Sequence, residues 1–387
     1  MASDRIAILY LIDYFHRTGG TETHLAQLIT GLPADRFRCS LVAFDLGTNA
    51  LLEGLRARGV PVVHLPVGRE YVPRAALQAW RLARLIRRER CDIVQTFHQK
   101  ADTYGALVAW LAGVKHLVSS KRDTGDLRRP WHVLTNRALR RLFDAFVAVA
   151  DGVRAAVLAN DHLPPARVFT IYNGVDTTRF AVPSAAQKAD ARSRFGFEAG
   201  DFVVGMVAGF RPEKNHDVFF EGLLQALPSI PTLRVLAVGG GPLLEQFRER
   251  LAHSVLGART VFTGDVADVL ACLWAMDVGC LTPGSNEGFS NAILEQMAVG
   301  LPMIVSDVGG NGEAVIDGVS GWIIPRLDSA ALSKALVAVH NDAERAAAMG
   351  RAARTRAQER FSLQRMCAEH AQLYVSLCAG TTRGAAT

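Results

Sequence analysis

The sequence predicts an α/β protein with two Rossmann-like domains whose parallel sheets face a central cleft. Its 387 residues are enough for two domains of ordinary size, each with its own core. Short β-branched runs alternate with helical patterns through both halves, which is typical of parallel sheets covered by helices on two sides. The alternation breaks at Asn173, where a polar segment containing proline is typical of a linker. Ligands of such sheets bind beyond the carboxyl ends of the strands, so we expect the functional site in the cleft.

The predicted strands form two series, one in each half of the chain. We expect residues 1–180 to form the N-terminal domain and residues 181–360 the C-terminal domain. Residues 361–387 are expected to form a helix that packs back on the N-terminal domain, followed by a tail. The strand runs are 6–12, 37–44, 61–65, 92–97, 116–120, 145–150 and 167–172, then 202–210, 233–240, 259–264, 277–282, 302–307 and 321–325.

Composition excludes several classes of protein. Hydrophobic residues make up 49% and charged residues 21% of the chain, as in a soluble globular enzyme and unlike a disordered or fibrous protein. No run approaches about 18 apolar residues, so we predict no membrane-spanning helix. The first apolar run is too short for a signal peptide and fits a strand. The six cysteines show neither a CxxC motif nor a metal-binding spacing, and we expect them to be reduced in a cytoplasmic protein.

The positive charge is concentrated in one segment. Between Arg69 and Arg141 there are 16 Lys and Arg against 6 Asp and Glu, an excess of +10 in a chain whose net charge is +6. Such a segment could attract an anionic membrane surface at the inner face of the plasma membrane or a phosphorylated acceptor, and ordinary solvated helix faces explain it equally well. We expect no nucleic acid as a partner, because no aromatic residues interleave the arginines as stacking platforms.

Two motifs follow strands of the first half. In HRTGGTETHL, residues 16–25, Gly19 and Gly20 allow a close approach of the backbone to a ligand at a helix start, although a plain strand-to-helix turn uses the same residues. The absence of a GxGxxG motif counts against a dinucleotide-dependent dehydrogenase. In TFHQKAD, His98 fits a proton-transfer or hydroxyl-binding group and fits a structural strand end equally well.

Two further motifs follow strands of the second half. In GFRPEKNH, Arg211 and Lys214 lie three residues apart, a spacing that turns both cations toward one anion such as a diphosphate; a solvated surface turn is the alternative. In EGFSNAILE, the segment Gly288-Phe289-Ser290-Asn291 predicts the first turn of a helix, with Ser290 as the N-cap and a positive dipole end that suits phosphate. Glu287 precedes this turn and Glu295 lies about two turns into the helix, where carboxylates can accept hydrogen bonds from sugar hydroxyls.

These motifs together resemble glycosyltransferase family 4, the retaining transferases of GT-B fold. The resemblance rests on GGTE, RPEK, the E-x7-E spacing of EGFSNAILE and the linker IYNGVDTTRF, and it runs from about Ile6 to Phe361. It implies an N-terminal acceptor-binding domain and a C-terminal domain that binds a nucleotide-sugar donor.

The resemblance also implies a role for each matching residue. Arg211 and Lys214 would hold the donor diphosphate, and the amides of Gly288 to Ser290 would cradle the leaving group. Glu295 would accept from the ribose and Glu287 from the transferred sugar. Gly20 would approach the phosphate from the other domain, His98 would lie beside the sugar, and Val261 and Phe262 would border the base.

The chain departs from the family pattern at three positions. Gly209 replaces the first arginine of the common G-R-[LF]-x-x-E-K loop, which places more of the phosphate role on Arg211. Gly284 replaces a frequent serine before Glu287, and Gly312 replaces the usual proline of the following glycine-rich loop.

The expected function is therefore transfer of a hexose from a nucleotide-diphosphate sugar to a hydroxyl of a glycan or lipid-linked acceptor, in the synthesis of polysaccharide or glycolipid. The resemblance implies retention and favours UDP, with GDP next. No DxD motif is present, so we expect no metal or other cofactor. The alternatives are a nucleotide-sugar epimerase or sugar phosphorylase of the same fold and a binding protein without turnover. A nicotinamide-dependent oxidoreductase is more distant.

Overall fold

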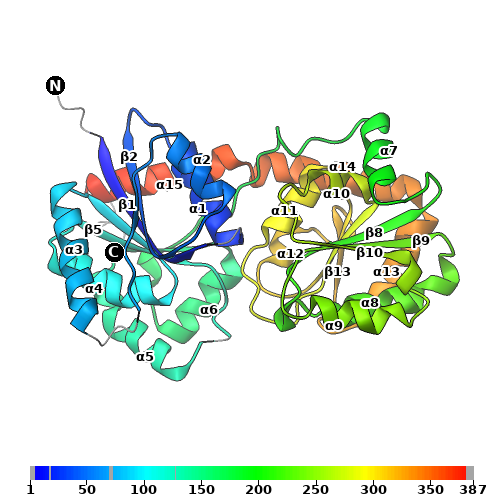
Figure 1. Cartoon of the computed structure of the whole chain (residues 1–387), viewed down its shortest axis with the longest axis horizontal. Helices are drawn as coiled ribbons and strands as arrows, with labels where there is room; N and C mark the ends of the chain where they lie inside the picture. Colours follow the sequence, from blue (N-terminus) through cyan, green and yellow to red (C-terminus); the bar gives the residue numbers. More distant parts are fainter. Residues whose placement is uncertain (1–4, 17–18, 69–72, 127, 381–387) are drawn as a thin grey trace. The chain divides into compact units, whose positions relative to one another are not determined.

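The computed structural model describes residues 5–16, 19–68, 73–126 and 128–380. The chain divides into two compact units (Figure 1). Met1–Gly174 together with Leu363–Thr387 form the N-terminal unit, and Val175–Ser362 form the C-terminal unit. The division lies a few residues before the position near 180 that we expected, and the chain returns to the N-terminal unit after Ser362.

The N-terminal unit is built on a parallel sheet. Its strand order is β3-β2-β1-β4-β5-β6-β7, with Ile8 of β1 paired to Cys39 of β2 and to Ile93 of β4. Most residues of β1 and β4–β6 are buried, which explains why these runs are apolar on both faces. The strands are β1 Ile6–Phe15, β2 Phe37–Leu46, β3 Val62–His64, β4 Ile93–Phe97, β5 His116–Lys121, β6 Ala145–Ala148 and β7 Val168–Thr170.

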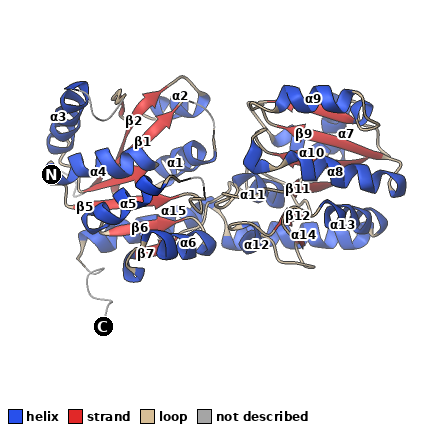
Figure 2. Cartoon of the chain, turned by 90° about the horizontal axis from the view of Figure 1, so that it is seen from below, coloured by secondary structure: helices blue, strands red, loops and turns tan. Residues whose placement is uncertain are grey.

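Helices cover both faces of this sheet (Figure 2). They are α1 Gly20–Gly31, α2 Ala50–Ala57, α3 Pro73–Arg88, α4 Ala106–Leu111, α5 Pro130–Leu139, α6 Asp151–Asp161 and the C-terminal α15 Leu363–Cys378. A π-helical turn η1, Ala101–Gly105, leads into α4, and short 3-10 turns are η2 Arg140–Leu142 and η3 Pro165–Arg167.

The C-terminal helix α15 belongs to the core of the N-terminal unit. Met366, Tyr374 and Leu377 are buried with the apolar side chains of β1, α1 and α2. The Tyr374 hydroxyl donates to Oε1 of Gln95 at 2.5 Å and accepts from the Tyr10 hydroxyl at 3.3 Å. Because an unpaired buried hydroxyl is costly, this chain of hydrogen bonds fixes the position of α15 on the sheet.

The C-terminal unit repeats the architecture with the strand order β10-β9-β8-β11-β12-β13, all parallel. Its strands are β8 Phe202–Val207, β9 Leu233–Val238, β10 Thr260–Gly264, β11 Val278–Leu281, β12 Met303–Ser306 and β13 Gly321–Ile324. Its helices are α7 Ala185–Arg194, α8 His216–Ala226, α9 Leu244–Ala252, α10 Leu270–Ala275, α11 Asn291–Ala298, α12 Asn311–Ala314, α13 Ser329–Asn341 and α14 Ala343–Arg360, with 3-10 turns η4 Pro212–Lys214, η5 Leu227–Ser229 and η6 Gly257–Arg259.

The structure confirms the predicted fold class. Each predicted strand run contains a strand, and both sheets are parallel. Several predicted runs extend beyond the strand end into the loop, as at 202–210, where β8 ends at Val207.

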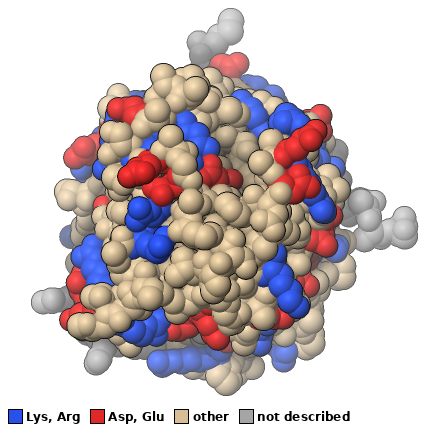
Figure 3. Space-filling view, turned by 90° about the vertical axis from the view of Figure 1, so that its right-hand side faces the viewer, with Lys and Arg blue, Asp and Glu red and all other residues tan. Residues whose placement is uncertain are grey.

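The surface carries both charge and exposed aromatic groups. Basic and acidic side chains are interspersed on the face shown in Figure 3. In the segment from Arg69 to Arg141, of which 69–72 and 127 lie outside the described residues, Trp80, Trp110 and Trp131 are 57%, 52% and 47% exposed. The expectation that no aromatic residues lie among these arginines is therefore wrong. All six cysteines are free, and no described helix is both long enough and apolar enough to cross a membrane.

Candidate functional site

The predicted donor residues of the C-terminal unit lie at the carboxyl ends of two neighbouring strands. The loop after β8 carries Arg211 and Lys214, and the loop after β11 carries Glu287. Because β8 and β11 pair directly, with Gly205 opposite Gly279, these loops emerge side by side although the chain between them contains two further strands. The amide of Gly284 donates to the carbonyl of Glu213 at 2.9 Å and joins the two loops.

Lys214 and Glu287 form an ion pair between these loops. The Lys214 Nζ lies 2.5 Å from Oε2 of Glu287, and the two side chains are 23% and 10% exposed. A pair so shielded from water resists screening better than a surface pair. The residual exposure leaves Lys214 able to contact a ligand, so the pair can hold a cation and a hydroxyl acceptor in one fixed geometry.

Arg211 supplies a second cation in the same loop. Its side chain is half-buried and forms no ion pair with a carboxylate in the described part of the chain. A Cβ added at Gly209 would lie 3.7 Å from the Arg211 Nε, so Arg211 covers the position where the family pattern places its first arginine. The loop therefore presents one cation paired to a carboxylate and one without such a partner, a combination suited to an added anion.

The turn after Glu287 packs against the glycine-rich loop that follows β12 and contains Gly309 and Gly310. The amide of Gly310 donates to the carbonyl of Gly288 at 2.7 Å. Gly309 has φ +58°, and a Cβ there would lie only 2.0 Å from the carbonyl oxygen of Glu287. Only glycine fits this approach, so the loop after β12 fixes the backbone that carries Glu287. Phe289 is buried against Phe361, with ring centroids 5.1 Å apart.

Ser290 occupies the N-cap position of α11, as predicted, but its side chain makes no capping hydrogen bond. The amides of Gly288 and Ser290 donate no hydrogen bond to any described residue. Asn291 is the first residue of α11, and the apolar side chains of Ile293, Leu294 and Met297 are buried as expected. The N-terminal end of α11 thus combines donor groups with the positive end of a helix dipole.

Glu295 lies on α11 in an environment that disfavours its charged form. Burial raises the pKa of its carboxyl to about 7; the charge of Arg179 lowers this pKa and that of Asp268 raises it. Arg179 and Asp268 form an exposed ion pair at 3.0 Å. Neither residue was predicted from the sequence, because nothing in their local pattern points to Glu295. A carboxyl with a pKa near neutrality fits a group whose charge is stabilised when a ligand donates hydrogen bonds to it.

A second glycine turn that the sequence analysis did not select packs on the cationic loop. The amide of Phe210 donates to the carbonyl of Gly240 at 2.7 Å, and the amide of Gly240 donates to Oδ1 of Asp265 at 2.8 Å. The three consecutive glycines 239–241 after a strand were the available signal. Phe262 lies on β10, with its ring 5.9 Å from that of Phe210, next to this turn.

The N-terminal unit places Gly19 and Gly20 at the start of α1, where Gly19 is the N-cap. A Cβ at Gly19 would meet the carboxylate of Glu22 at 2.5 Å, and Glu22 is buried. Glu22 is also one of two carboxylates that raise the pKa of Arg122, which burial lowers to about 9. This turn therefore contains a buried acid, Glu22, that interacts electrostatically with the half-buried Arg122, and no local sequence pattern predicts this interaction. Arg17 and Thr18 of the same motif lie outside the described residues.

His98 follows β4 in a special backbone conformation. Its φ is +74°, and its ring stacks on that of Tyr14, 4.5 Å between centroids and 12° between planes. Asp13 supports this loop by accepting from the amides of Lys100 at 2.9 Å and Ala101 at 2.6 Å. Burial raises the pKa of Asp13 to about 7, and those two hydrogen bonds oppose the rise. His98 is thus held rigidly at the carboxyl edge of the sheet, where ligands of such sheets bind.

A buried polar network lies beneath this edge. Asp102 accepts from Thr96 at 2.5 Å, from Ser119 at 2.8 and 2.9 Å and from Lys121 at 2.7 Å. The Lys121 and Asp102 side chains are 9% and 6% exposed. A buried charge pair with all these hydrogen bonds ties η1 to β4 and β5, and so positions the turn that carries His98.

Two family models match the chain. The model described as "Glycosyltransferase Family 4" matches residues 18–179, and the model described as "Glycosyl transferases group 1" matches residues 187–356. The two matches fall almost entirely within the two halves on either side of the linker.

Similar proteins of known name and structure agree with these models. The chain is 30% identical over 370 residues, 90% of this chain and 92% of the relative, to the GDP-mannose-dependent alpha-(1-6)-phosphatidylinositol monomannoside mannosyltransferase of Mycobacterium tuberculosis. It is 28% identical over 80% of its length, and 82% of the relative's, to the UDP-Gal:alpha-D-GlcNAc-diphosphoundecaprenol alpha-1,3-galactosyltransferase of Escherichia coli. The fold matches that of Anabaena Alr3699/HepE in complex with UDP and glucose, with a TM-score of 0.86, 22% identity and coverage of 96% of this chain and 100% of that chain. The chain is a glycosyltransferase of GT-B fold and belongs to glycosyltransferase family 4.

Proposed function

We propose that the protein transfers a hexose from a UDP-sugar to a hydroxyl of a lipid-linked or glycolipid acceptor, with retention at the anomeric carbon. The observation that carries this proposal is the Lys214–Glu287 ion pair beside Arg211 and the N-terminal end of α11. It combines cations for a diphosphate with an acceptor for a sugar hydroxyl. Retention rests on the family alone.

The chemistry proposed for these residues is electrostatic. Arg211, Lys214 and the donors at the start of α11 stabilise the negative charge that develops on the departing diphosphate. Glu287 orients the transferred sugar, and Glu295 accepts from the ribose hydroxyls. His98 binds a sugar hydroxyl or moves a proton. Displacement proceeds on the front face without a covalent intermediate, and the two cations perform the charge neutralisation that a metal performs in other transferases.

The names of the relatives support a lipid-linked acceptor. The Escherichia coli relative is named for a diphosphoundecaprenol acceptor and the Mycobacterium tuberculosis relative for a phosphatidylinositol mannoside. The same two names carry UDP and GDP, so a GDP-sugar is the second candidate donor. The assignment of the acceptor to the N-terminal unit and of the donor to the C-terminal unit is part of this proposal.

The first test is thermal unfolding with UDP, GDP, ADP or NAD, each in EDTA. A ligand at about 100 times its dissociation constant adds about 2.7 kcal/mol to the free energy of unfolding, which raises Tm by a few degrees. Stabilisation by UDP that is lost in Glu295→Ala supports the donor class and its ribose anchor together. Stabilisation by NAD alone, or by none of the four, contradicts the proposal.

Turnover separates the remaining alternatives. A transferase releases UDP from its donor in proportion to an added acceptor hydroxyl, in EDTA as well as in magnesium. An epimerase converts the nucleotide sugar without an acceptor, a phosphorylase requires inorganic phosphate, and a binding protein shows stabilisation without product. The anomeric configuration of the product, determined by NMR coupling constants, tests retention.

Peripheral membrane contact belongs to the proposal as well. Trp80 on α3 and Trp110 on α4 are exposed next to arginines of the basic segment, and a surface with both apolar and cationic groups binds anionic interfaces. Binding to anionic vesicles that weakens between low and moderate salt is expected; binding that ignores salt, or no binding, rejects this part.

A further inference from the structure

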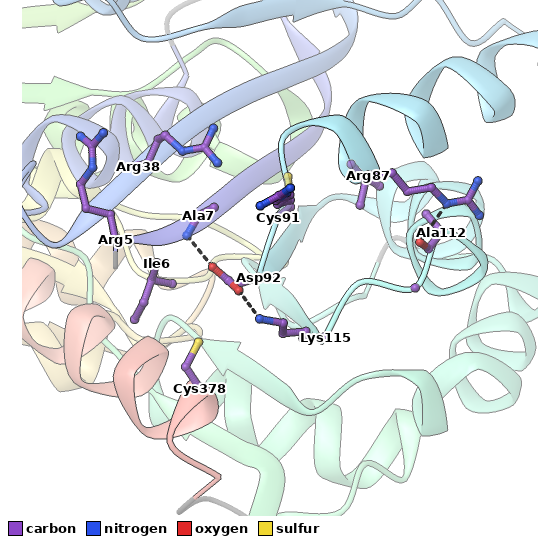
Figure 4. A pocket seen from close by; sticks show the side chains of 13 residues that line it. Arg5, Ile6, Ala7, Arg38, Arg87, Cys91, Asp92, Ala112, Lys115 and Cys378 are labelled. Atoms are coloured by element: carbon purple, nitrogen blue, oxygen red, sulfur yellow. Dashed lines mark hydrogen bonds and ion pairs between the residues drawn. The ribbon is translucent and has the colours of Figure 1, made fainter. Parts of the chain in front are cut away.

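A large pocket of the N-terminal unit lies at the edge of the sheet opposite to His98 and Gly19. It has a volume of about 940 Å³, within the range of small-molecule sites. Its lining comes from the residues at or just before the amino ends of β1, β2, β4 and β5, together with the ends of α3, α4 and α15 (Figure 4). Because strands in this sheet are parallel, the pocket is separate from the proposed transfer site.

The lining of this pocket is strongly basic. It contains Arg5, Arg38, Arg87, Arg90 and Lys115 against a single carboxylate, that of Asp92. Five positive charges and one negative charge leave an excess of four positive charges on the lining.

Two of the five cations are neutralised by acids. Lys115 lies 2.7 Å from Oδ1 of Asp92, whose other oxygen accepts from the Ala7 amide at 2.9 Å (Figure 4). Arg38 lies 2.9 Å from Oε2 of Glu89.

The other three cations have no carboxylate partner among the described residues. Arg87 caps the C-terminal end of α4 by donating to the carbonyls of Leu111 and Ala112. Arg5 donates to the carbonyl of Ala34 at 3.3 Å, and Arg90 is exposed. Three arginines that line one pocket without a carboxylate partner leave a positive potential there, which favours an added anion.

The corresponding edge of the C-terminal unit provides a comparison. A pocket of about 550 Å³ lies there, and its cations Lys188 and Arg192 both pair with Asp277, at 2.8 and 2.5 Å. At this edge of the sheet, the two cations of the C-terminal unit are paired with a carboxylate, whereas three arginines of the N-terminal unit have no described carboxylate partner. The surplus is a property of this pocket and not a general feature of the fold.

We propose that this pocket is a second anion site, which binds a phosphate-bearing ligand away from the transfer site. Arginine matches phosphate through paired N–H donors, and several arginines in a concave site favour a diphosphate over a single carboxylate. The ligand is a soluble diphosphate or the phosphate of an anionic lipid headgroup. The lipid source is compatible with Trp110 and Leu111, which are exposed at 52% and 62% beside the Ala112 that lines the pocket.

Cys378 provides a reporter inside the pocket. It is exposed at the end of α15 and lines the same wall as Lys115. Burial and Asp92 raise the pKa of its thiol and Lys115 lowers it, so an anion bound nearby both shields the thiol and raises its pKa further. Binding in the pocket therefore slows alkylation of Cys378.

The test measures the rate of Cys378 alkylation by iodoacetamide, read by mass spectrometry at constant ionic strength. The probes are pyrophosphate, phosphatidylglycerol vesicles and neutral phosphatidylcholine vesicles. The test variant is Arg5→Gln with Arg90→Gln, because neither side chain belongs to a described ion pair. The matched control is Arg56→Gln with Arg58→Gln, which removes two exposed charges from the same unit, outside both the pocket and the basic segment.

Saturable protection by pyrophosphate identifies a soluble ligand, and protection by phosphatidylglycerol vesicles alone identifies a headgroup. In either case the concentration for half protection rises about tenfold or more in the test variant and changes less than about twofold in the control. Absence of protection by pyrophosphate and by phosphatidylglycerol vesicles overturns the proposal, as does equal protection by the neutral phosphatidylcholine vesicles or an equal loss in the two variants. Circular dichroism of each variant checks that it is folded, and single Arg90→Gln replaces the double variant if that one does not fold.

Discussion

Lys214 and Glu287 are separated by 73 residues in the sequence and lie 2.5 Å apart in the structure. The pair joins the turn after β8 to the turn before α11, and it places a cation and a carboxylate at the carboxyl edge of the sheet in the C-terminal unit. Because both side chains are mostly shielded, removal of one partner leaves the other charge uncompensated. The pair therefore has consequences both for binding and for turnover.

Glu287→Gln is expected to lower kcat/KM by about 10- to 100-fold, the cost of losing one charged hydrogen bond to the transferred sugar. The affinity for UDP is expected to be unchanged or higher, since Lys214 is released toward the diphosphate. Steady-state kinetics and calorimetric titration with UDP measure the two effects. Glu213→Gln is the control, because the described contact of Glu213 uses only its backbone carbonyl. A parallel loss of UDP affinity in Glu287→Gln would contradict this role.

Arg211→Met is expected to weaken UDP binding by at least about tenfold and to leave uridine binding unchanged, since only UDP carries the diphosphate. The comparison of the two ligands separates a phosphate contact from general damage to the site. Lys334→Met removes an exposed cation from α13 and is the matched control. Equal weakening of uridine and UDP in Arg211→Met would show that the guanidinium supports the loop and does not contact phosphate.

The strands were predictable because their sequence pattern is local. A run that is apolar on both faces, as at Ile93–Phe97, has few alternatives to a central parallel strand. The ends of the strands were less predictable, because they depend on loop contacts. The Phe210 amide bonds to Gly240, which belongs to a different loop, and this bond keeps Phe210 outside β8.

Lys214 and Glu287 were predicted as site residues from their separate motifs, but no local pattern predicts that they pair. Their contact depends on β8 and β11 being neighbours in the sheet, and sheet order is a non-local property. The buried acid Glu22 was missed for the same reason, since Arg122 follows a different strand. The exposed Trp80 was overlooked because its neighbours in the sequence are mostly charged or apolar helix formers, and only packing shows which of them face water.

Uridine binding is expected to strengthen as the pH rises from 6 to 8. Glu295 has a pKa of about 7 in the free protein, and the ribose hydroxyls donate to its charged form. Affinity therefore rises by up to about tenfold per pH unit below 7 and levels off above it. Uridine is used because it carries no phosphate that titrates in this range. The same slope in Glu295→Gln would assign the titration to another group, such as Asp13, whose pKa is also about 7.

The Glu295 carboxyl is expected to make the free energy of unfolding fall with rising pH, whereas it makes uridine affinity rise. Burial raises the pKa of Glu295 from 4.5 to about 7, so the folded state binds the proton more tightly than the unfolded state. The free energy of unfolding then falls as the pH rises from about 4.5 to 7. Without ligand, Glu295→Gln is expected to raise Tm relative to the original protein at pH 8 by more than at pH 5. An equal change at both values would contradict the raised pKa.

His98→Ala is expected to lower the transfer rate by at least about 10², the contribution of a positioned proton-transfer group. UDP is expected to stabilise this variant as much as the original protein, because the proposed UDP contacts belong to the C-terminal unit. His64→Ala, which removes an exposed histidine from β3, is the control. An unchanged rate in His98→Ala would leave the stacking of His98 on Tyr14 as a purely structural contact.

Alanine substitutions at two glycines of the C-terminal unit distinguish the effect of backbone strain from the effect of displacing Glu287. Gly309 and Gly318 have φ of +58° and +71°, so alanine is strained at both positions. At Gly309 the new Cβ also lies 2.0 Å from the Glu287 carbonyl, whereas at Gly318 nothing lies within 4 Å. Gly318→Ala is expected to cost about 1 kcal/mol of stability and to keep its activity.

Gly309→Ala is expected to lose more stability than Gly318→Ala and at least about tenfold in kcat/KM, because the backbone that aims Glu287 toward Lys214 has to move. Urea unfolding gives the difference in the free energy of unfolding, and kinetics on the folded fraction gives the difference in activity. If the two variants lose stability equally and keep equal activity, the contact of Gly309 with Glu287 does not control the site. A selective loss of kcat/KM in Gly309→Ala instead shows that the loop after β12 sets the geometry of the Lys214–Glu287 pair.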